Sequence, residues 1–183
     1  MRIFAPVLIA GLLAAPASAE VVDSASGGFA THDSALVAAD RAAVWEALIH
    51  PEEWWSHTWS DDSANLSLDA RAGGCFCETI PPGDVWPAGS VEHMRVIGVM
   101  PGTMLRMSGA LGPLQSEGIL GTLTVTLEDA EEGTRITWDY VLGGQARFPA
   151  AQFAPVVDGV QTEFLTALVI RLGGPVDDAG QGE

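Results

Sequence analysis

The 183-residue sequence is strongly acidic: 24 Asp and Glu residues stand against 8 Lys and Arg, giving a formal net charge of −16. Such a field repels phosphate backbones and anionic lipid surfaces, so the composition argues against nucleic acid as a partner. The acids are scattered and do not follow the spacing of a calcium-binding loop, so they predict solubility and no metal site.

The first 19 residues have the pattern of a secretory signal peptide. Arg2 precedes an apolar run over residues 3–15, and Ala17-Ser18-Ala19 places small residues at both positions that a cleavage site requires. The run is shorter than the roughly 20 residues of a membrane span, so no stable membrane anchor is expected. We therefore expect cleavage after Ala19 and export to the periplasm or the medium.

Removing 19 of the 183 residues leaves 164, enough for one domain with its own core. Residues 21–28 have no clear pattern and are expected to be loose. Phe29 to Val37 is typical of a strand. Asp40 is a candidate N-cap for a short helix that ends at Pro51, and Glu52 to Trp55 predicts a further helical turn.

From Ala64 onward the apolar residues recur with a period of two, which predicts strands. The last two strands alternate most clearly, with Leu123 on one face of the first and Trp138 and Tyr140 on the inward face of the second. The expected strands span residues 65–69, 75–80, 90–100, 104–111, 119–127 and 135–142.

The last long segment, residues 149–172, has the apolar spacing of a helix with one broad hydrophobic face. Pro155 predicts that a short turn comes first and that the main helix begins near this proline. Gly173, Gly174 and Pro175 end the helix, and residues 175–183 are expected to be a loose tail. Strands followed by one apolar helix indicate the α+β class, with a curved antiparallel sheet closing over the helix.

Several motifs in this order resemble one known superfamily. They are Ala39 to Leu48 with Pro51 and Trp54-Trp55, Gly73 to Glu78, Gly89 to Pro101, and Gly133 to Thr137 before the last helix. Together they are similar to the START-like, or SRPBCC, superfamily, in the branch of the activator of the heat-shock ATPase and the polyketide cyclase-like proteins. The resemblance covers residues 29–174. It implies a helix-grip fold with two short helices after the first strand and a hydrophobic cavity beside the last helix.

The resemblance does not imply one reaction, because superfolds carry many functions. We expect a small hydrophobic or amphipathic ligand and no cofactor. The alternatives are an enzyme acting on such a ligand by general acid–base chemistry, and a protein-interaction module of the heat-shock ATPase activator type. Whether the protein is an enzyme, and its oligomeric state, stay open. The predicted cavity residues are aromatic and apolar residues of inward faces, with Glu78 and Tyr140 as polar handles: Phe76, Glu78, Leu105, Met107, Leu123, Trp138, Tyr140, Phe153, Val160 and Phe164.

Two further features bear on chemistry. Cys75 and Cys77 flank Phe76 at positions that are commonly polar or basic in the family, and they should share one face of a strand. Extended geometry favours free thiols there, with a strained disulfide and a metal site as alternatives. His93 is adjacent to Glu92 on a predicted strand, and such a histidine is more often half-buried and structural than an acid or base.

Overall fold

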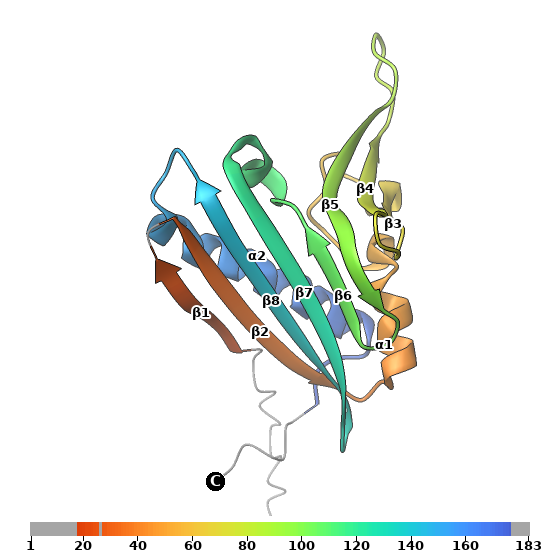
Figure 1. Cartoon of the computed structure of the whole chain (residues 1–183). Coiled ribbons are helices and arrows are strands. Elements are labelled where there is room, and N and C mark those ends of the chain that lie inside the picture. The colour runs from red at the N-terminus through yellow and green to blue at the C-terminus, as the bar shows by residue number, and fades with distance from the viewer. Residues whose placement is uncertain (1–17, 26, 177–183) are drawn as a thin grey trace, which may run out of the picture.

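The computed structural model describes residues 18–25 and 27–176. Its strands form one antiparallel sheet of eight members in the order β1-β2-β8-β7-β6-β5-β4-β3 (Figure 1). Most of the predicted signal segment, and the tail beyond Val176, lie outside the described residues. The strands are β1 (Ser18–Ala25), β2 (Gly28–Val37), β3 (Leu66–Leu68), β4 (Cys75–Ile80), β5 (Gly89–Met100), β6 (Met104–Ser108), β7 (Gly118–Ala130) and β8 (Gly133–Gln145).

The helices lie before and after the main run of strands. The short helix α1 (Arg41–Leu48) begins as predicted at Asp40, whose Oδ1 accepts a 2.8 Å hydrogen bond from the Ala43 N–H. Three short 3-10 turns follow at Pro51–Glu53, Ser63–Asn65 and Gly112–Ser116. The long helix α2 (Ala150–Arg171) comes last.

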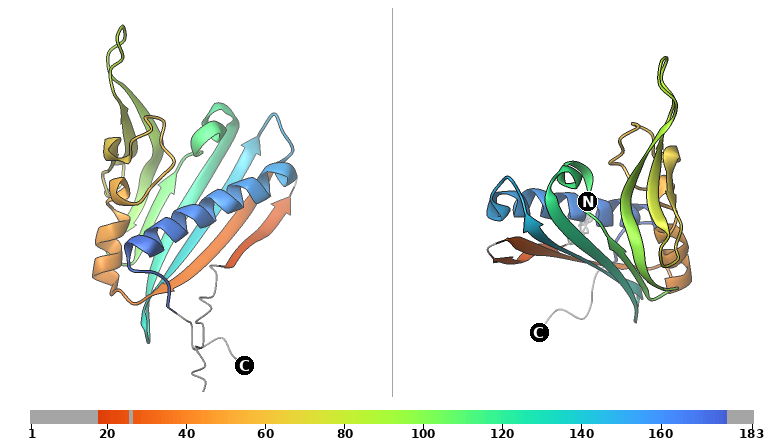
Figure 2. Two further views of the ribbon diagram at one scale, coloured as in Figure 1. Left: turned by 180° about the vertical axis from the view of Figure 1, so that it is seen from behind. Right: turned by 45° about the horizontal axis from the view of Figure 1, so that its top comes forward.

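The sheet curves around α2, which runs diagonally across its concave face (Figure 2). The inward residues of β7 and β8 form the centre of the core, and Leu123, Trp138 and Tyr140 are completely buried. By length and composition, Gln152–Arg171 could also span a membrane. Its packing against the sheet identifies it as the core helix of a helix-grip fold, so the predicted fold class is confirmed.

The structure corrects two details of the chain's ends. Residues 18–25, mostly expected to be signal peptide or loose chain, form β1 and pair with β2. Pro155 lies inside one continuous helix instead of starting it. Its ring lies in the second turn of the helix, where the missing N–H removes a single backbone hydrogen bond. At the other end, the Val176 N–H donates a 2.9 Å bond to the Leu36 carbonyl, so the predicted tail is held to β2 where it begins.

Candidate functional site

A cavity of about 630 Å³ lies between the sheet, the first half of α2 and two covering segments. One covering segment is the loop after Trp55, and the other is the turn Gly112–Ser116 with Leu111 before it. Apolar surface dominates the lining. The residues that line the cavity are Trp55, Ser56, His57, Thr58, Trp59, Asp61, His93, Leu111, Gly112, Pro113, Leu114, Tyr140, Phe153, Val156, Val157, Val160, Gln161 and Phe164.

Four of the ten residues predicted to line the cavity do so: Tyr140, Phe153, Val160 and Phe164. The other six lie elsewhere, and the part of the sheet that carries four of them is covered by Leu48, Pro51 and two tryptophans. Phe76, Leu105, Met107 and Trp138 pack with Trp54 and Trp55 around a void too small for a ligand. Leu123 is completely buried in the core, and Glu78 lies behind the cavity wall.

The loop at residues 56–61 was not among the predicted cavity residues, and it forms one wall of the cavity. Its shape depends on one local hydrogen bond and on two long-range bonds to Glu78. The Trp55 indole N–H donates to the His57 carbonyl at 3.0 Å. The backbone N–H groups of Trp59 and Ser60 donate to the Glu78 carboxylate at 3.0 and 2.6 Å. No local pattern in this segment signals those partners, although its cluster of tryptophans marks it as unusual.

His93 lines the cavity, and Glu78 lies behind it, so that the two form a buried pair. The distance from His93 Nε2 to Glu78 Oε2 is 2.8 Å, and both side chains are almost completely excluded from solvent. The His93 ring also stacks on Phe76, with centroids 4.9 Å apart. Glu78 thus fixes the histidine and the loop at once, although it does not line the cavity itself.

A β-bulge explains why His93 faces inward. Phe76 pairs with Met94 and Cys77 pairs with Glu92, so His93 is the extra residue of β5. A bulge of this kind re-aims one side chain and bends the strand. Consequently His93 and Met94, which are adjacent in sequence, are both buried. Simple alternation along the strand cannot predict this.

The electrostatics of the pair leave His93 neutral with an available acceptor. Burial lowers the pKa of His93, and the bond to Glu78 only partly opposes this effect. For Glu78, burial favours the neutral acid, but hydrogen bonds from Ser60, Trp59 and His93 prevail and lower the pKa of the carboxyl. An ionised Glu78 requires the proton of His93 on Nε2. Nδ1 then keeps its lone pair, and it accepts no bond from the described residues.

Two more polar groups meet the cavity from β8 and α2. The Tyr140 hydroxyl donates to the Gly109 carbonyl at 3.1 Å, and the ring lies against Gly121, where any side chain would collide with it. Burial raises the pKa of Tyr140, so the phenol stays protonated. The Gln161 amide oxygen accepts a 2.8 Å bond from the Trp138 indole. Within the described part of the chain the Gln161 NH₂ has no partner, which leaves a donor in the cavity wall.

A family model described as "Activator of Hsp90 ATPase homolog 1-like protein" matches residues 38–173, which include the cavity and the buried pair. The chain belongs to this family. It is thereby a START-like, SRPBCC-type protein, as the sequence motifs indicated. No protein with curated annotation matches the chain.

Solved structures share the fold of this chain at low sequence identity. A putative uncharacterized protein from Rhizobium leguminosarum is 17% identical, with a TM-score of 0.58 over 87% of this chain and 99% of that one. A protein of unknown function from Staphylococcus aureus is 12% identical, with a TM-score of 0.60 over 81% and 95%. CalU16 from Micromonospora echinospora is 13% identical, with a TM-score of 0.54 over 88% and 85%. These likenesses establish the fold alone.

A second polar cluster is buried between β2 and α2. Thr162 donates a 2.8 Å bond to Asp33 Oδ1. Among the described residues, one enclosed side-chain oxygen each of Thr31, Asp33 and Asp158 has no hydrogen-bond partner. Burial raises the pKa of Asp33 to about 6, against the lowering effect of the Thr162 bond; Asp158 and Asp139 raise it further, and His32 lowers it.

Asp33→Asn is expected to remove a pH dependence of stability. Because the folded-state pKa is above the unfolded value, the native state holds the extra proton, and wild type loses stability as pH rises from about 4 to about 6. We expect a loss of about 1–3 kcal/mol relative to the asparagine variant over this window. Denaturant unfolding at several pH values measures it. Parallel stability profiles for the two proteins would contradict the assignment.

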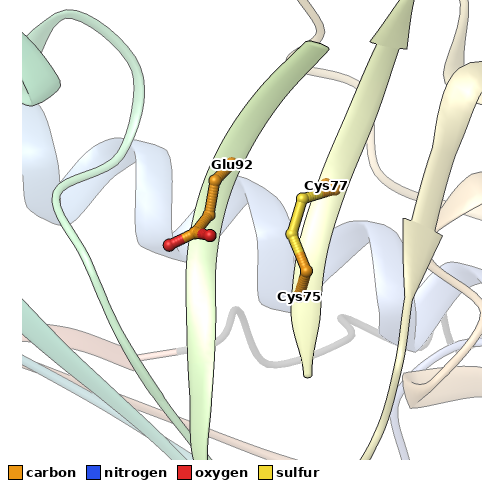
Figure 3. Close-up of side chains that lie close together, drawn as sticks. All are labelled: Cys75, Cys77 and Glu92. Atoms are coloured by element: carbon orange, nitrogen blue, oxygen red, sulfur yellow. A yellow bond between two sulfur atoms is a disulfide. The ribbon is translucent and has the colours of Figure 1, made fainter. Parts of the chain in front are cut away.

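The outer face of β4 in this family member carries a disulfide between Cys75 and Cys77 (Figure 3). The expectation of free thiols is therefore wrong, and the alternative of a disulfide is the one that the structure shows. Opposite the bulge of β5 the strand is contracted, and the two Cα atoms lie 5.4 Å apart. An extended strand would separate them by roughly 6.4–6.8 Å, and disulfides occur at roughly 4.4–6.8 Å. The Glu92 carboxylate lies beside the two sulfurs.

Proposed function

We propose that the protein binds a small hydrophobic or amphipathic molecule in the cavity between the sheet and α2. The observation that carries this proposal is the cavity itself. Its volume of about 630 Å³ lies within the range of roughly 300–1,000 Å³ typical of ligand pockets. Its lining is apolar with a few convergent polar groups, and a solid core of the same fold would have no such space. START-like proteins share an architecture in which such a cavity recurs.

The polar groups constrain the chemistry of the ligand. His93 Nδ1 offers an acceptor, and the Gln161 NH₂ offers a donor. A ligand hydroxyl could donate to His93 Nδ1 and accept from the Gln161 NH₂, whereas a carbonyl would satisfy only the amide. The apolar body of the ligand would contact Val157, Val160 and Phe164. Buried polar groups that stay unpaired in a complex cost about 1–3 kcal/mol each, so a purely aliphatic ligand should bind less well.

Binding of a fluorescent apolar probe tests the proposal. We expect one saturable site per chain, with displacement by any molecule that co-purifies with the protein and is detected by native mass spectrometry. A valine-to-tryptophan exchange at Val160, which fills the cavity, should abolish the signal while leaving the circular dichroism spectrum unchanged. Wild-type protein that binds no probe would refute the proposal and leave the function on the outer surface.

The Glu78–His93 pair favours general base catalysis in the same cavity as the second candidate function. A neutral imidazole held by a carboxylate is the arrangement that general bases use. Incubating the co-purifying molecule with wild type and with His93→Gln distinguishes the two candidates. Turnover by wild type alone would establish an enzyme, and unchanged molecule with both proteins would leave a binding protein.

We also propose that the protein is exported and that its mature chain begins at Glu20. The support is the small-residue pattern behind the apolar run. Cleavage after Ala19 would remove two residues of β1 and leave Glu20 to Ala25 available to pair with β2. Peptide mass mapping of the exported protein should find an N-terminal Glu20. A chain that retains Met1 outside the cytoplasm would contradict this.

A further inference from the structure

The disulfide between Cys75 and Cys77 lies on the face of β4 that points away from the cavity. Phe76 and Glu78 are buried on the inner face, whereas both cysteines are half-exposed and Glu92 is exposed. The bridge closes a ring over a single intervening residue. Since the stabilisation of a disulfide through the unfolded chain grows with loop length, this one contributes little as a structural crosslink. Its position calls for a chemical role.

The surroundings of the two sulfurs supply a third ligand. The sulfurs and a carboxylate oxygen of Glu92 lie within 4.8 Å of one another (Figure 3). Tetrahedral zinc ligands are about 3.4–3.8 Å apart, given Zn–S and Zn–O bonds of about 2.3 and 2.1 Å. Small side-chain adjustments therefore suffice once the S–S bond is broken.

Arg95 completes the arrangement. Its guanidinium forms an ion pair with Glu92 through Oε2 and donates to the Gly73 carbonyl at 3.2 Å. Glu92 Oε1 has no hydrogen-bond partner among the described residues, so one carboxylate oxygen is held in place and the other is available. A hydrogen-bonded partner that orients a ligand in this way is common around metal sites.

We propose that Cys75, Cys77 and Glu92 form a Zn²⁺ site that becomes available when the disulfide is reduced. A thiol reductant supplies two electrons and two protons: two R–SH are oxidised to R–S–S–R, and the protein disulfide becomes two thiols. Zn²⁺ then displaces the two thiol protons. Two thiolates and Glu92 carry three negative charges, and Arg95 and Zn²⁺ supply three positive ones, so the site is neutral when filled.

The two thiolates and one carboxylate favour Zn²⁺ over other metals. Two thiolates alone would suit Cu⁺, but the carboxylate is a harder ligand that Zn²⁺ accepts and Cu⁺ does not favour. Three protein ligands leave the fourth position to water. The site is independent of the ligand cavity, because it uses the opposite face of β4.

Zn²⁺ titration of the full chain against a chromophoric chelator tests this inference. Protein reduced with a phosphine under anaerobic conditions should bind one Zn²⁺ per chain, and oxidised protein none. Cys75→Ser and Cys77→Ser should abolish stoichiometric binding, and Glu92→Gln should weaken it by at least about tenfold. Glu131→Gln, which removes an exposed carboxylate from the β7–β8 turn, is the matched control and should leave the affinity unchanged.

Co²⁺ in place of Zn²⁺ should give a thiolate-to-metal charge-transfer band that disappears in either serine variant. Binding that survives Cys77→Ser, or reduced wild type that binds less than one equivalent, overturns the proposal. Probe binding to the cavity, measured on the same samples, should be unaffected by the serine variants. The two proposals can therefore fail separately.

Discussion

Replacing Glu78 with alanine should lower the free energy of unfolding by about 3–5 kcal/mol, because three hydrogen-bond donors lose a charged acceptor at about 1–3 kcal/mol each. The carboxylate accepts hydrogen bonds from the Trp59 and Ser60 N–H groups and contacts His93 Nε2. Alanine leaves all three donors without this acceptor, and the His93 side chain is almost completely excluded from solvent. Denaturant unfolding measures the loss.

Two matched variants show whether the loss of stability comes from the buried pair or only from the removal of a negative charge. Glu78→Gln should cost less than alanine, because its amide oxygen still accepts a bond. Glu92→Ala removes an exposed carboxylate next to Val91, the residue of β5 that pairs with Glu78, and should cost less than about 1 kcal/mol. If Glu78→Ala is no more destabilising than Glu92→Ala, the buried pair does not organise this region.

Glu78→Ala should also weaken binding of the fluorescent probe to the protein that remains folded. Glu78 holds two parts of the cavity wall, the loop at residues 56–61 and the ring of His93. Loss of the carboxylate frees both. Glu78 does not line the cavity, so weaker binding in this variant would show that Glu78 acts by positioning the wall and not by contacting the ligand.

Local sequence patterns predicted the elements whose causes are local. The alternation of β7 and β8 placed Leu123, Trp138 and Tyr140 inward, and all three are completely buried. Asp40 marked the start of α1 because an N-cap acts within its own helical turn. These elements with the family motifs were sufficient for the fold class.

The cavity depends on strand register and on side-chain contacts between distant residues, which no local sequence pattern reveals. The bulge at His93 exists only in the register between β4 and β5. Glu78 reaches N–H groups 18 and 19 residues away, and Asp33 meets Thr162 at a separation of 129 residues. Strand assignments therefore predicted which residues are buried, but not which of them meet a cavity.

The cysteine prediction failed for a related reason. Ideal strand geometry separates residues i and i+2 too far for an easy bridge, and it was applied to a strand that is contracted opposite a bulge. One irregularity thus has consequences on both faces of the sheet. It turns His93 into the cavity, and it accompanies the approach of Cys75 and Cys77 on the outside.

Phe164→Ala should reduce ligand affinity more than it reduces stability. The ring is buried and stacks on Trp55 with centroids 3.5 Å apart, and the His57 ring lies nearly perpendicular to it with centroids 5.0 Å apart. In a solid core this truncation would cost about 3–5 kcal/mol. Because one side of Phe164 faces the cavity, fewer packing contacts are lost, and we expect less than about 3 kcal/mol.

Leu168→Ala on the same helix is the matched control. Leu168 is completely buried and does not line the cavity, so its truncation should cost about 2–5 kcal/mol and leave the affinity of the folded protein nearly unchanged. Phe164→Ala should instead weaken probe binding by about tenfold or more, equivalent to about 1.4 kcal/mol. Denaturation and probe titrations on the three proteins give both quantities. If the two variants lose stability and affinity in the same proportion, Phe164 is ordinary core and does not form a ligand-binding wall.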